Sequence, residues 1–209
     1  SAVEATASLK ADGIEDLAAV LGAFTTNGVK PAVYINAFRD ELAPYAMRDA
    51  AVKYKGDTKY LWLDGTTDKG GKPWLNPYSA QATGYIKDIV AEVVAAGGSD
   101  IIVGGIQFPT GHGLDLGFYG DTTTTKQAVL AAFISELNAL AAQKGAVMYY
   151  EFPLAAFTAD GAAQYGAVAL EFKAVNYIVQ VNAAEADVAA KLAALAAQFS
   201  EQSAATCFV

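Results

Sequence analysis

Three carboxyl groups in this sequence stand where acid–base chemistry could be done. Glu151 lies near the end of the apolar run 146–152. An apolar setting can raise the pKa of a carboxyl group toward that of a general acid. Asp40 and Asp64 could each supply the second group of an acid–base pair. Each of the three also has a structural interpretation. Asp40 can pair with the adjacent Arg39, Asp64 begins an Asp-Gly turn, and Glu151 can be a hydrogen-bonded structural acid.

Strands that alternate with helices would have to position these groups. Apolar runs rich in β-branched residues predict strands over 30–38, 99–109, 146–152 and 175–181, with a weaker candidate over 167–172 and a last strand over 206–209. Apolar residues at helical spacing predict helices over 12–24 and 85–96, a short helix over 43–54, a helix after the threonine run 122–125, and a last helix capped by Asn182 with Glu185 at the capping-box position. Such alternation indicates an α/β fold with a parallel sheet and right-handed crossovers. Either an open doubly wound sheet or a (β/α) barrel would fit.

Composition and charge limit the classes of partner. The 209-residue chain has a formal net charge of −8 and no cluster of basic residues, which disfavours nucleic acid and anionic membrane surfaces. No apolar run is long enough for membrane insertion. Gly104 and Gly105 lie inside a strand-like run and no Gly-Lys-Ser/Thr occurs, which disfavours a nucleotide-binding Rossmann domain. His112, Asp115 and Asp121 lack metal-ligand spacing, so we expect no metal and no cofactor.

Three segments resemble, in order and spacing, a family of glycosidase-like domains first described as a bacterial domain of unknown function. They are Ala37-Phe38-Arg39-Asp40, Trp74-Leu75-Asn76-Pro77-Tyr78, and residues 99–109, which resemble Asp-Glu-Ile-Gln-Phe-Asp-Tyr-Ile-Arg-Phe-Pro in the family. The resemblance covers residues 12–140. It implies a (β/α) TIM-barrel-like domain over 1–209, a carbohydrate-active function, and an extracellular or cell-surface location in a bacterium.

The third segment departs from the family where its chemistry would lie. The family's Asp falls on Gly104, its Tyr on Gly105 and its Arg on Gln107. The expected catalytic Asp is therefore missing, and hydrolysis would fall to the three carboxyl groups named above, which would have to stand about 5–9.5 Å apart. A full barrel needs about 250 residues. We therefore expect an incomplete or truncated barrel that lacks N-terminal strands.

Polar and aromatic residues follow several of the predicted strands. In a barrel the carboxyl ends of the strands converge on one mouth, where active sites lie. Aromatic rings there could stack on the C–H faces of sugar rings, while amide groups bond sugar hydroxyls. The substrate-binding candidates are Arg39, Trp74, Asn76, Tyr78, Gln107, Tyr150 and Gln180. For Trp74 and Tyr78, packing in the core is the alternative.

The lead hypothesis is a glycoside-hydrolase-like domain that binds a glycan or polysaccharide and could hydrolyse it. A first alternative is a catalytically inactive relative that serves as a carbohydrate-binding or structural module. A second is an assembly module, because exposed sheet edges of an incomplete barrel invite self-association.

Overall fold

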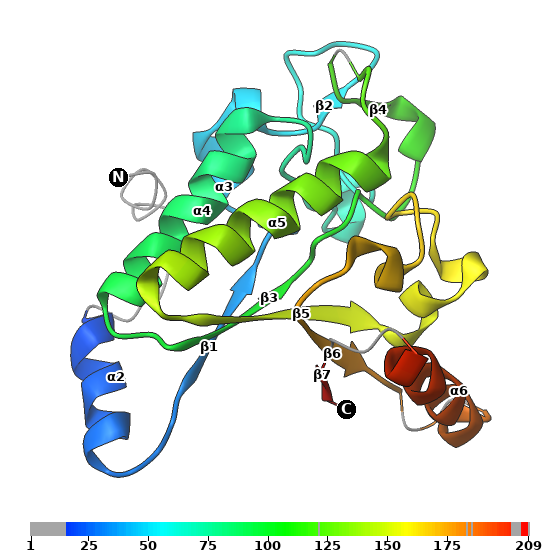
Figure 1. The fold of residues 1–209 in the computed structure, drawn as a ribbon. Coiled ribbons are helices and arrows are strands. Elements are labelled where there is room, and N and C mark those ends of the chain that lie inside the picture. The colour runs from blue at the N-terminus through cyan, green and yellow to red at the C-terminus, as the bar shows by residue number, and fades with distance from the viewer. Residues whose placement is uncertain (1–15, 121, 183, 185, 202–205, 209) are drawn as a thin grey trace.

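The computed structural model describes residues 16–120, 122–182, 184, 186–201 and 206–208. In this part of the chain five strands form one sheet in which all neighbours run parallel (Figure 1). In their order across the sheet they are β1 (Ala32–Asn36), β3 (Asp100–Gly104), β5 (Val147–Pro153), β6 (Asn176–Gln180) and β7 (Thr206–Phe208). This order follows the chain without reversal, as in a (β/α) barrel and unlike a doubly wound sheet.

The described sheet is open. Among the described strands, β1 forms one edge and β7 the other, and they do not pair with each other. A closed TIM barrel has eight parallel strands. The predicted α/β class is therefore confirmed, and so is the predicted incomplete (β/α) barrel.

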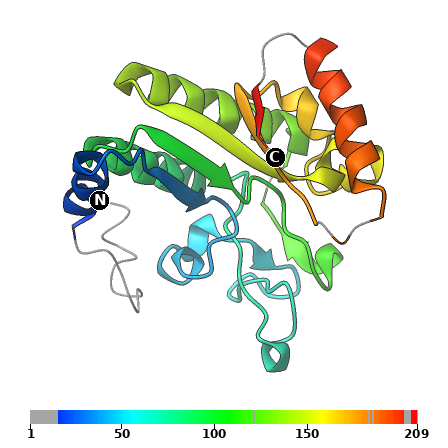
Figure 2. The same cartoon turned by 90° about the horizontal axis from the view of Figure 1, so that it is seen from below.

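Two long helices cover one face of the sheet. They are α4 (Ala80–Ala95) and α5 (Lys126–Lys144), which lie side by side across the strands (Figures 1 and 2). Each begins at a hydroxyl side chain: Ser79 Oγ accepts from Ala82 N at 3.3 Å, and Thr125 Oγ1 accepts from Ala128 N at 3.2 Å. Such capping satisfies amide groups that the first turn leaves unpaired.

Two further helices lie near the ends of the described chain. They are α2 (Leu17–Thr26) and α6 (Val188–Glu201). None of the described helices is both long enough and apolar enough to span a membrane.

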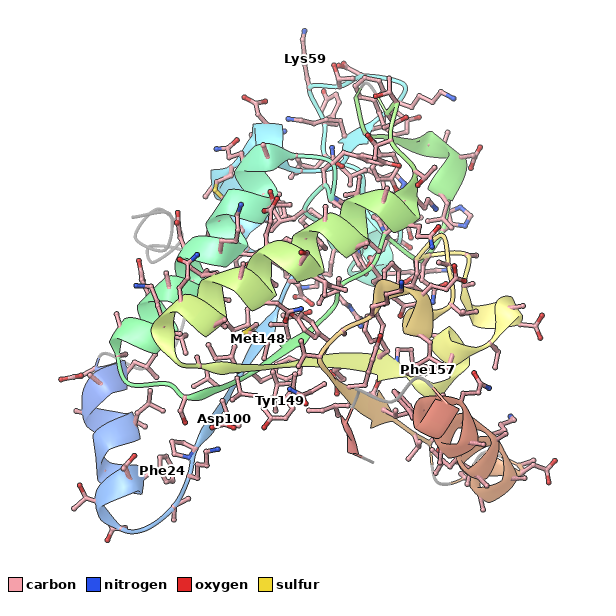
Figure 3. All side chains as sticks on the ribbon, viewed as in Figure 1. Phe24, Lys59, Asp100, Met148, Tyr149 and Phe157 are labelled. Carbon is pink, nitrogen blue, oxygen red and sulfur yellow. The ribbon has the colours of Figure 1, made fainter. Side chains whose placement is uncertain are left out.

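The two faces of the sheet differ in burial. Side chains alternate along each strand, and Val103 and Met148 belong to the buried core under α4 and α5. Ile102 and Tyr149 face the other side and are only partly buried. Figure 3 shows the contrast: Tyr149 and Asp100 lie on the side of the sheet away from α4 and α5. This second face would be the interior of a closed barrel.

Two loops form a separate structure at the carboxyl ends of the strands. We call it the rim lobe: residues 37–78, which follow β1, and 105–124 except 121, which follow β3. It contains α3 (Ala43–Ala46), the 3₁₀ helices η1 (Arg48–Ala50), η2 (Thr67–Lys69) and η3 (Leu114–Leu116), and an antiparallel pair, β2 (Lys53–Tyr54) with β4 (Gly117–Phe118). Trp62 Nε1 donates to Gly113 O at 2.9 Å and so ties the two loops together.

Several expected elements are wrong. The helix over 43–54 breaks after α3, because Ala51 and Lys53 pair instead with Leu75 and Leu61. The weak strand over 167–172 is the 3₁₀ helix η6 (Ala169–Phe172), one of three that follow β5 with η4 (Leu154–Phe157) and η5 (Ala159–Gly161).

The expected cap of the last helix is also wrong. Asn182 does not cap α6, because its Oδ1 accepts from Ala184 N at 3.0 Å in a local turn before the helix begins. Glu185 lies outside the described residues, as do residues 12–15 of the first predicted helix.

Candidate functional site

A pocket of about 270 Å³ lies at the carboxyl ends of β1, β3, β5 and β6. We call it the rim pocket. It is lined by Tyr34, Asn36, Arg39, Gly105, Ile106, Gln107, Glu151, Pro153, Tyr165 and Gln180. Four of these residues were predicted from the sequence as site residues: Arg39, Gln107, Glu151 and Gln180. Parallel strands bring these four residues together although they are spread over residues 39–180 of the chain.

Glu151 is held by a tyrosine from two strands away. Tyr34 Oη donates to Glu151 Oε2 at 2.6 Å, from β1 to β5 and across β3. The residue of β3 between them is Gly104. A Cβ at Gly104 would overlap Tyr34 Oη and stand 2.8 Å from Glu151 Oε2. The missing side chain at Gly104, where the family has an Asp, therefore makes room for the tyrosine–carboxylate pair.

The surroundings of Tyr34 keep its hydroxyl protonated. Burial of the hydroxyl, its hydrogen bond to Glu151 and the charge of Glu151 raise the pKa of Tyr34 to about 12, against a smaller opposing effect of Arg39. Tyr34 is 53% exposed overall, so one side of the ring faces solvent while the hydroxyl points into the rim pocket. At neutral pH the phenol is therefore a neutral donor toward Glu151.

The neighbours of Glu151 in the sequence do not surround it in space. Tyr150 and Phe152 point to the opposite face of β5, where they are buried in the core. Tyr150 Oη donates to Asn138 Oδ1 at 2.7 Å on α5. Tyr150 and Phe152 therefore do not form the apolar environment that the sequence predicted for Glu151. Tyr150, expected to bind substrate, lies in the core because strand residues alternate between faces.

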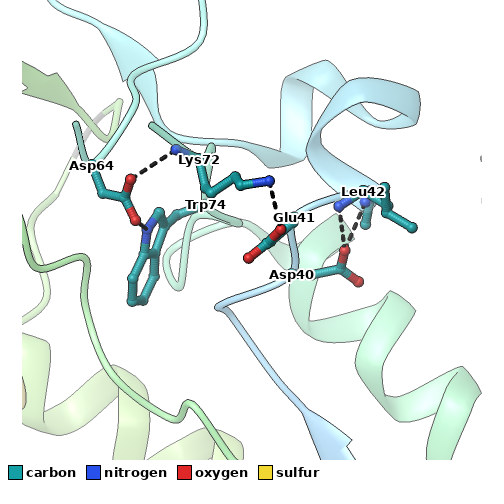
Figure 4. Close-up of polar contacts among 7 residues, drawn as sticks. Asp40, Glu41, Leu42, Asp64, Lys72 and Trp74 are labelled. Carbon is teal, nitrogen blue, oxygen red and sulfur yellow. Dashed lines mark hydrogen bonds and ion pairs between the residues drawn. The ribbon is translucent and has the colours of Figure 1, made fainter. Parts of the chain in front are cut away.

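The other two predicted carboxylates are engaged in local structure (Figure 4). Asp40 Oδ1 accepts from the backbone amides of Leu42 and Ala43, both at 2.8 Å, just before and at the first residue of α3. Asp64 Oδ1 accepts from Lys72 N at 2.7 Å and its Oδ2 from Trp74 Nε1 at 3.0 Å. Neither lines the rim pocket. The structure does not bring them together with Glu151 as an acid–base pair.

The predicted aromatic and amide contacts from the segment 74–78 hold the rim lobe in place. Trp74 is 1% exposed and Asn76 is 7% exposed, so neither offers a surface to a sugar. Asn76 Nδ2 donates to Tyr119 O at 3.0 Å. Tyr78 is partly buried and packs with its ring centroid 5.1 Å from that of Phe108. Trp74 is therefore packed in the interior, which was the alternative to a sugar-binding role for this residue.

Trp74 nevertheless acts on the rim pocket through Arg39. The guanidinium carbon of Arg39 lies 5.8 Å from the centre of the Trp74 ring, within the range of a cation–π contact. Arg39 also passes close to Gly105, where an added Cβ would lie 3.4 Å from Arg39 Cβ. Gly105 has φ +64°, a conformation that glycine adopts without strain.

Among the residues of the rim pocket that sequence reasoning missed, three have polar side chains: Tyr34, Asn36 and Tyr165. Tyr34 and Asn36 are two residues apart on β1, so the period of a strand places them on one face. Tyr165 Oη donates to Gln107 Oε1 at 3.1 Å from a loop that carried no predicted element. Among the described residues, no group of three or more His, Cys, Asp or Glu side chains is arranged to hold a metal ion.

Solved structures share the fold at low sequence identity. A hypothetical protein from Ruminiclostridium thermocellum ATCC 27405 is 22% identical with a TM-score of 0.52, and the alignment covers 64% of each chain. A variant of the glycoside hydrolase domain of PelA from Pseudomonas aeruginosa is 15% identical with a TM-score of 0.51, over 87% of this chain and 69% of that one. This chain therefore spans only about two thirds of the length of either, and the identities show a common fold alone.

A search of curated proteins finds no match. A family model described as "Putative glycosyl hydrolase domain" matches residues 1–162. This match covers more than half of the chain, including β1, β3, β5 and the rim lobe between them. The chain belongs to this family of glycosyl-hydrolase-like domains.

Proposed function

We propose that the rim pocket binds a glycan. The observation that carries the proposal is the meeting of Arg39, Gln107, Glu151 and Gln180 at the carboxyl ends of parallel strands, which is where (β/α)-barrel enzymes place their sites. A sugar presents hydroxyl groups that both donate and accept hydrogen bonds. The pocket supplies donors from Arg39 and the amides, and an acceptor from Glu151.

Hydrolysis of the bound glycan is the second candidate, and the contact between Tyr34 and Glu151 favours it. Glu151 is the only carboxylate among the described residues that line the rim pocket, whereas glycoside hydrolysis commonly uses two. A tyrosine serves as the nucleophile in some glycosidases. In that role Tyr34 Oη would bond to the anomeric carbon as the bond to the leaving oxygen breaks, the tyrosine proton would pass to Glu151 Oε2, and the leaving oxygen would take a proton from water. The hydroxide that remains would then attack the anomeric carbon and break its bond to Tyr34 Oη, and Tyr34 would take its proton back from Glu151.

A glycan panel tests both candidates with one pair of variants. Glu151→Gln removes the negative charge in the rim pocket. Glu136→Gln removes a carboxylate on α5 that pairs with Lys87 at 2.7 Å outside the pocket. We expect wild type and Glu136→Gln to bind the same glycans and Glu151→Gln to bind them more weakly. If wild type binds no glycan of a broad panel, the proposal is wrong.

Reducing-end release by the same proteins separates binding from catalysis. Release by wild type that is lost in Glu151→Gln supports hydrolysis. Binding without release supports the inactive binding module, the first alternative. The extracellular or cell-surface location stays a prediction, which localisation of the tagged protein in its native cells would test.

A further inference from the structure

Arg39 gives the rim pocket a positive charge that no carboxylate of the described residues neutralises in an ion pair. The chain as a whole nevertheless has a net charge of −8. The adjacent Asp40 accepts hydrogen bonds from Leu42, Ala43 and Tyr85 instead. The charge of Arg39 is therefore available to a bound molecule.

The guanidinium of Arg39 is positioned by an aromatic ring. It lies over the ring of Trp74, and Trp74 is fixed in turn by its hydrogen bond to Asp64. Stacking on a ring uses the flat face of a guanidinium and leaves the N–H groups in its plane free to donate. These in-plane groups form the fork that matches a carboxylate with two parallel hydrogen bonds.

The neighbouring amide adds a donor to this side of the pocket. Gln107 Oε1 accepts from Tyr165 Oη at 3.1 Å, which leaves the NH₂ group of Gln107 to donate. Glu151, the negative group of the pocket, already accepts from Tyr34. The pocket therefore has a donor side at Arg39 and Gln107 and an acceptor at Glu151.

We propose that the rim pocket selects a sugar that carries a carboxylate, such as a uronic acid, and that Arg39 binds this carboxylate. The proposal rests on the proposed glycan binding and names its substrate class. Asp64 and Trp74 then act as positioning residues for Arg39, which gives both predicted site residues an indirect part in the site.

Matched oligosaccharides provide the test. Acidic oligosaccharides are compared by calorimetry with their carboxyl-reduced forms, which keep the linkage and the ring but lack the charge. We expect wild type to bind the acidic form about tenfold more tightly or better, since a hydrogen bond to a charged group contributes that much. Arg39→Gln should remove the difference and Arg39→Lys should keep part of it. Arg48→Gln, which removes the same charge where Arg48 Nη2 bonds Lys59 O in the rim lobe, should leave it unchanged.

The outcomes separate this proposal from the one on which it rests. Equal binding of acidic and reduced forms by wild type overturns acidic selectivity and leaves glycan binding standing. A preference for the acidic form that persists in folded Arg39→Gln overturns the role of Arg39. If wild type binds neither form of any pair but does bind other glycans of the panel, acidic selectivity is wrong and glycan binding stands; if it binds nothing at all, both proposals are wrong. The comparison of oligosaccharides on wild type needs no variant to fold.

Discussion

Removal of one hydroxyl group tests whether Tyr34 holds Glu151. Tyr34→Phe keeps the ring and deletes the donor of the 2.6 Å hydrogen bond to Glu151 Oε2. A hydrogen bond to a charged group contributes about 1.5–3 kcal/mol when it is well buried. Tyr34 is 53% exposed, so solvent screening lowers the expected loss of unfolding free energy to about 0.5–1.5 kcal/mol.

Urea unfolding measures this loss from the transition midpoint at constant slope. Tyr60→Phe is the matched control, because Tyr60 is 63% exposed in the rim lobe, where we expect a change below about 0.3 kcal/mol. The same Tyr34→Phe protein should also bind glycan more weakly, since Glu151 loses the group that orients it. A loss of stability no larger than that of Tyr60→Phe, with unchanged glycan affinity, would refute the reasoning.

Three further predictions follow from the same contacts. Gly104→Ala should push the Tyr34 hydroxyl away from Glu151, and a folded variant whose glycan affinity matches wild type would count against this. Glu151→Gln should lower the pKa of Tyr34 from about 12, because it removes the charge of Glu151 and leaves at most a weaker hydrogen bond to a neutral amide oxygen; an unchanged titration of the Tyr34 ring carbon by NMR would contradict this. Burial alone would raise the pKa of Asp100, but its hydrogen bonds, including that from Lys30 Nζ at 2.9 Å, outweigh burial and lower it. The stability that wild type gains over Asp100→Asn should therefore be full above the ordinary value of 3.8 and shrink as pH falls through the lower folded value, which thermal unfolding measured between about pH 2.5 and 7 would confirm or contradict.

The framework of the fold could be predicted because its signals are local. Period and composition predicted β1, β3, β6 and β7 within their ranges and β5 to within one residue at its end, and helical spacing predicted α4 and α5. The same reasoning failed within 43–54, where residues pair with partners beyond the local segment. Pairing between segments that are distant in the sequence produces no hydrophobic periodicity in either segment, so it cannot be recognised from the sequence pattern.

The candidate site could be predicted where it depends on the ends of strands. Arg39, Gln107, Glu151 and Gln180 were found because each follows or ends a predicted strand, and parallel strands bring such ends together. Asp64 could not be placed, since the amide of Lys72 and the indole of Trp74 that it binds belong to a loop of no regular period.

Tyr34 was missed for a different reason. An aromatic residue in an apolar strand is usually part of the core, and only the alternation along β1 sets it on the open face. The sequence showed Gly104 as a glycine inside a strand-like run where the family has an Asp, but the room that it makes for other side chains depends on how β1, β3 and β5 pair. The hydroxyl of Tyr34 and the carboxylate of Glu151 come from the strands on either side of β3 and meet over Gly104.

Self-association stays a prediction. The described part of the sheet has β1 and β7 as its edges, and strand edges can pair with another chain. Light scattering over a range of concentrations would show a mass that rises with concentration if the edges associate, and a constant monomer mass would contradict the assembly alternative.

The most direct test of the central claim is an NMR titration of the wild-type protein with a carboxylate-bearing oligosaccharide. Backbone amide shifts should change first at Asn36, Arg39, Gly105, Gln107 and Glu151, the residues around the rim pocket. Saturable shift changes confined to another surface would contradict a glycan site at the ends of these strands. So would an oligosaccharide that binds without changing the shifts of the residues around the rim pocket.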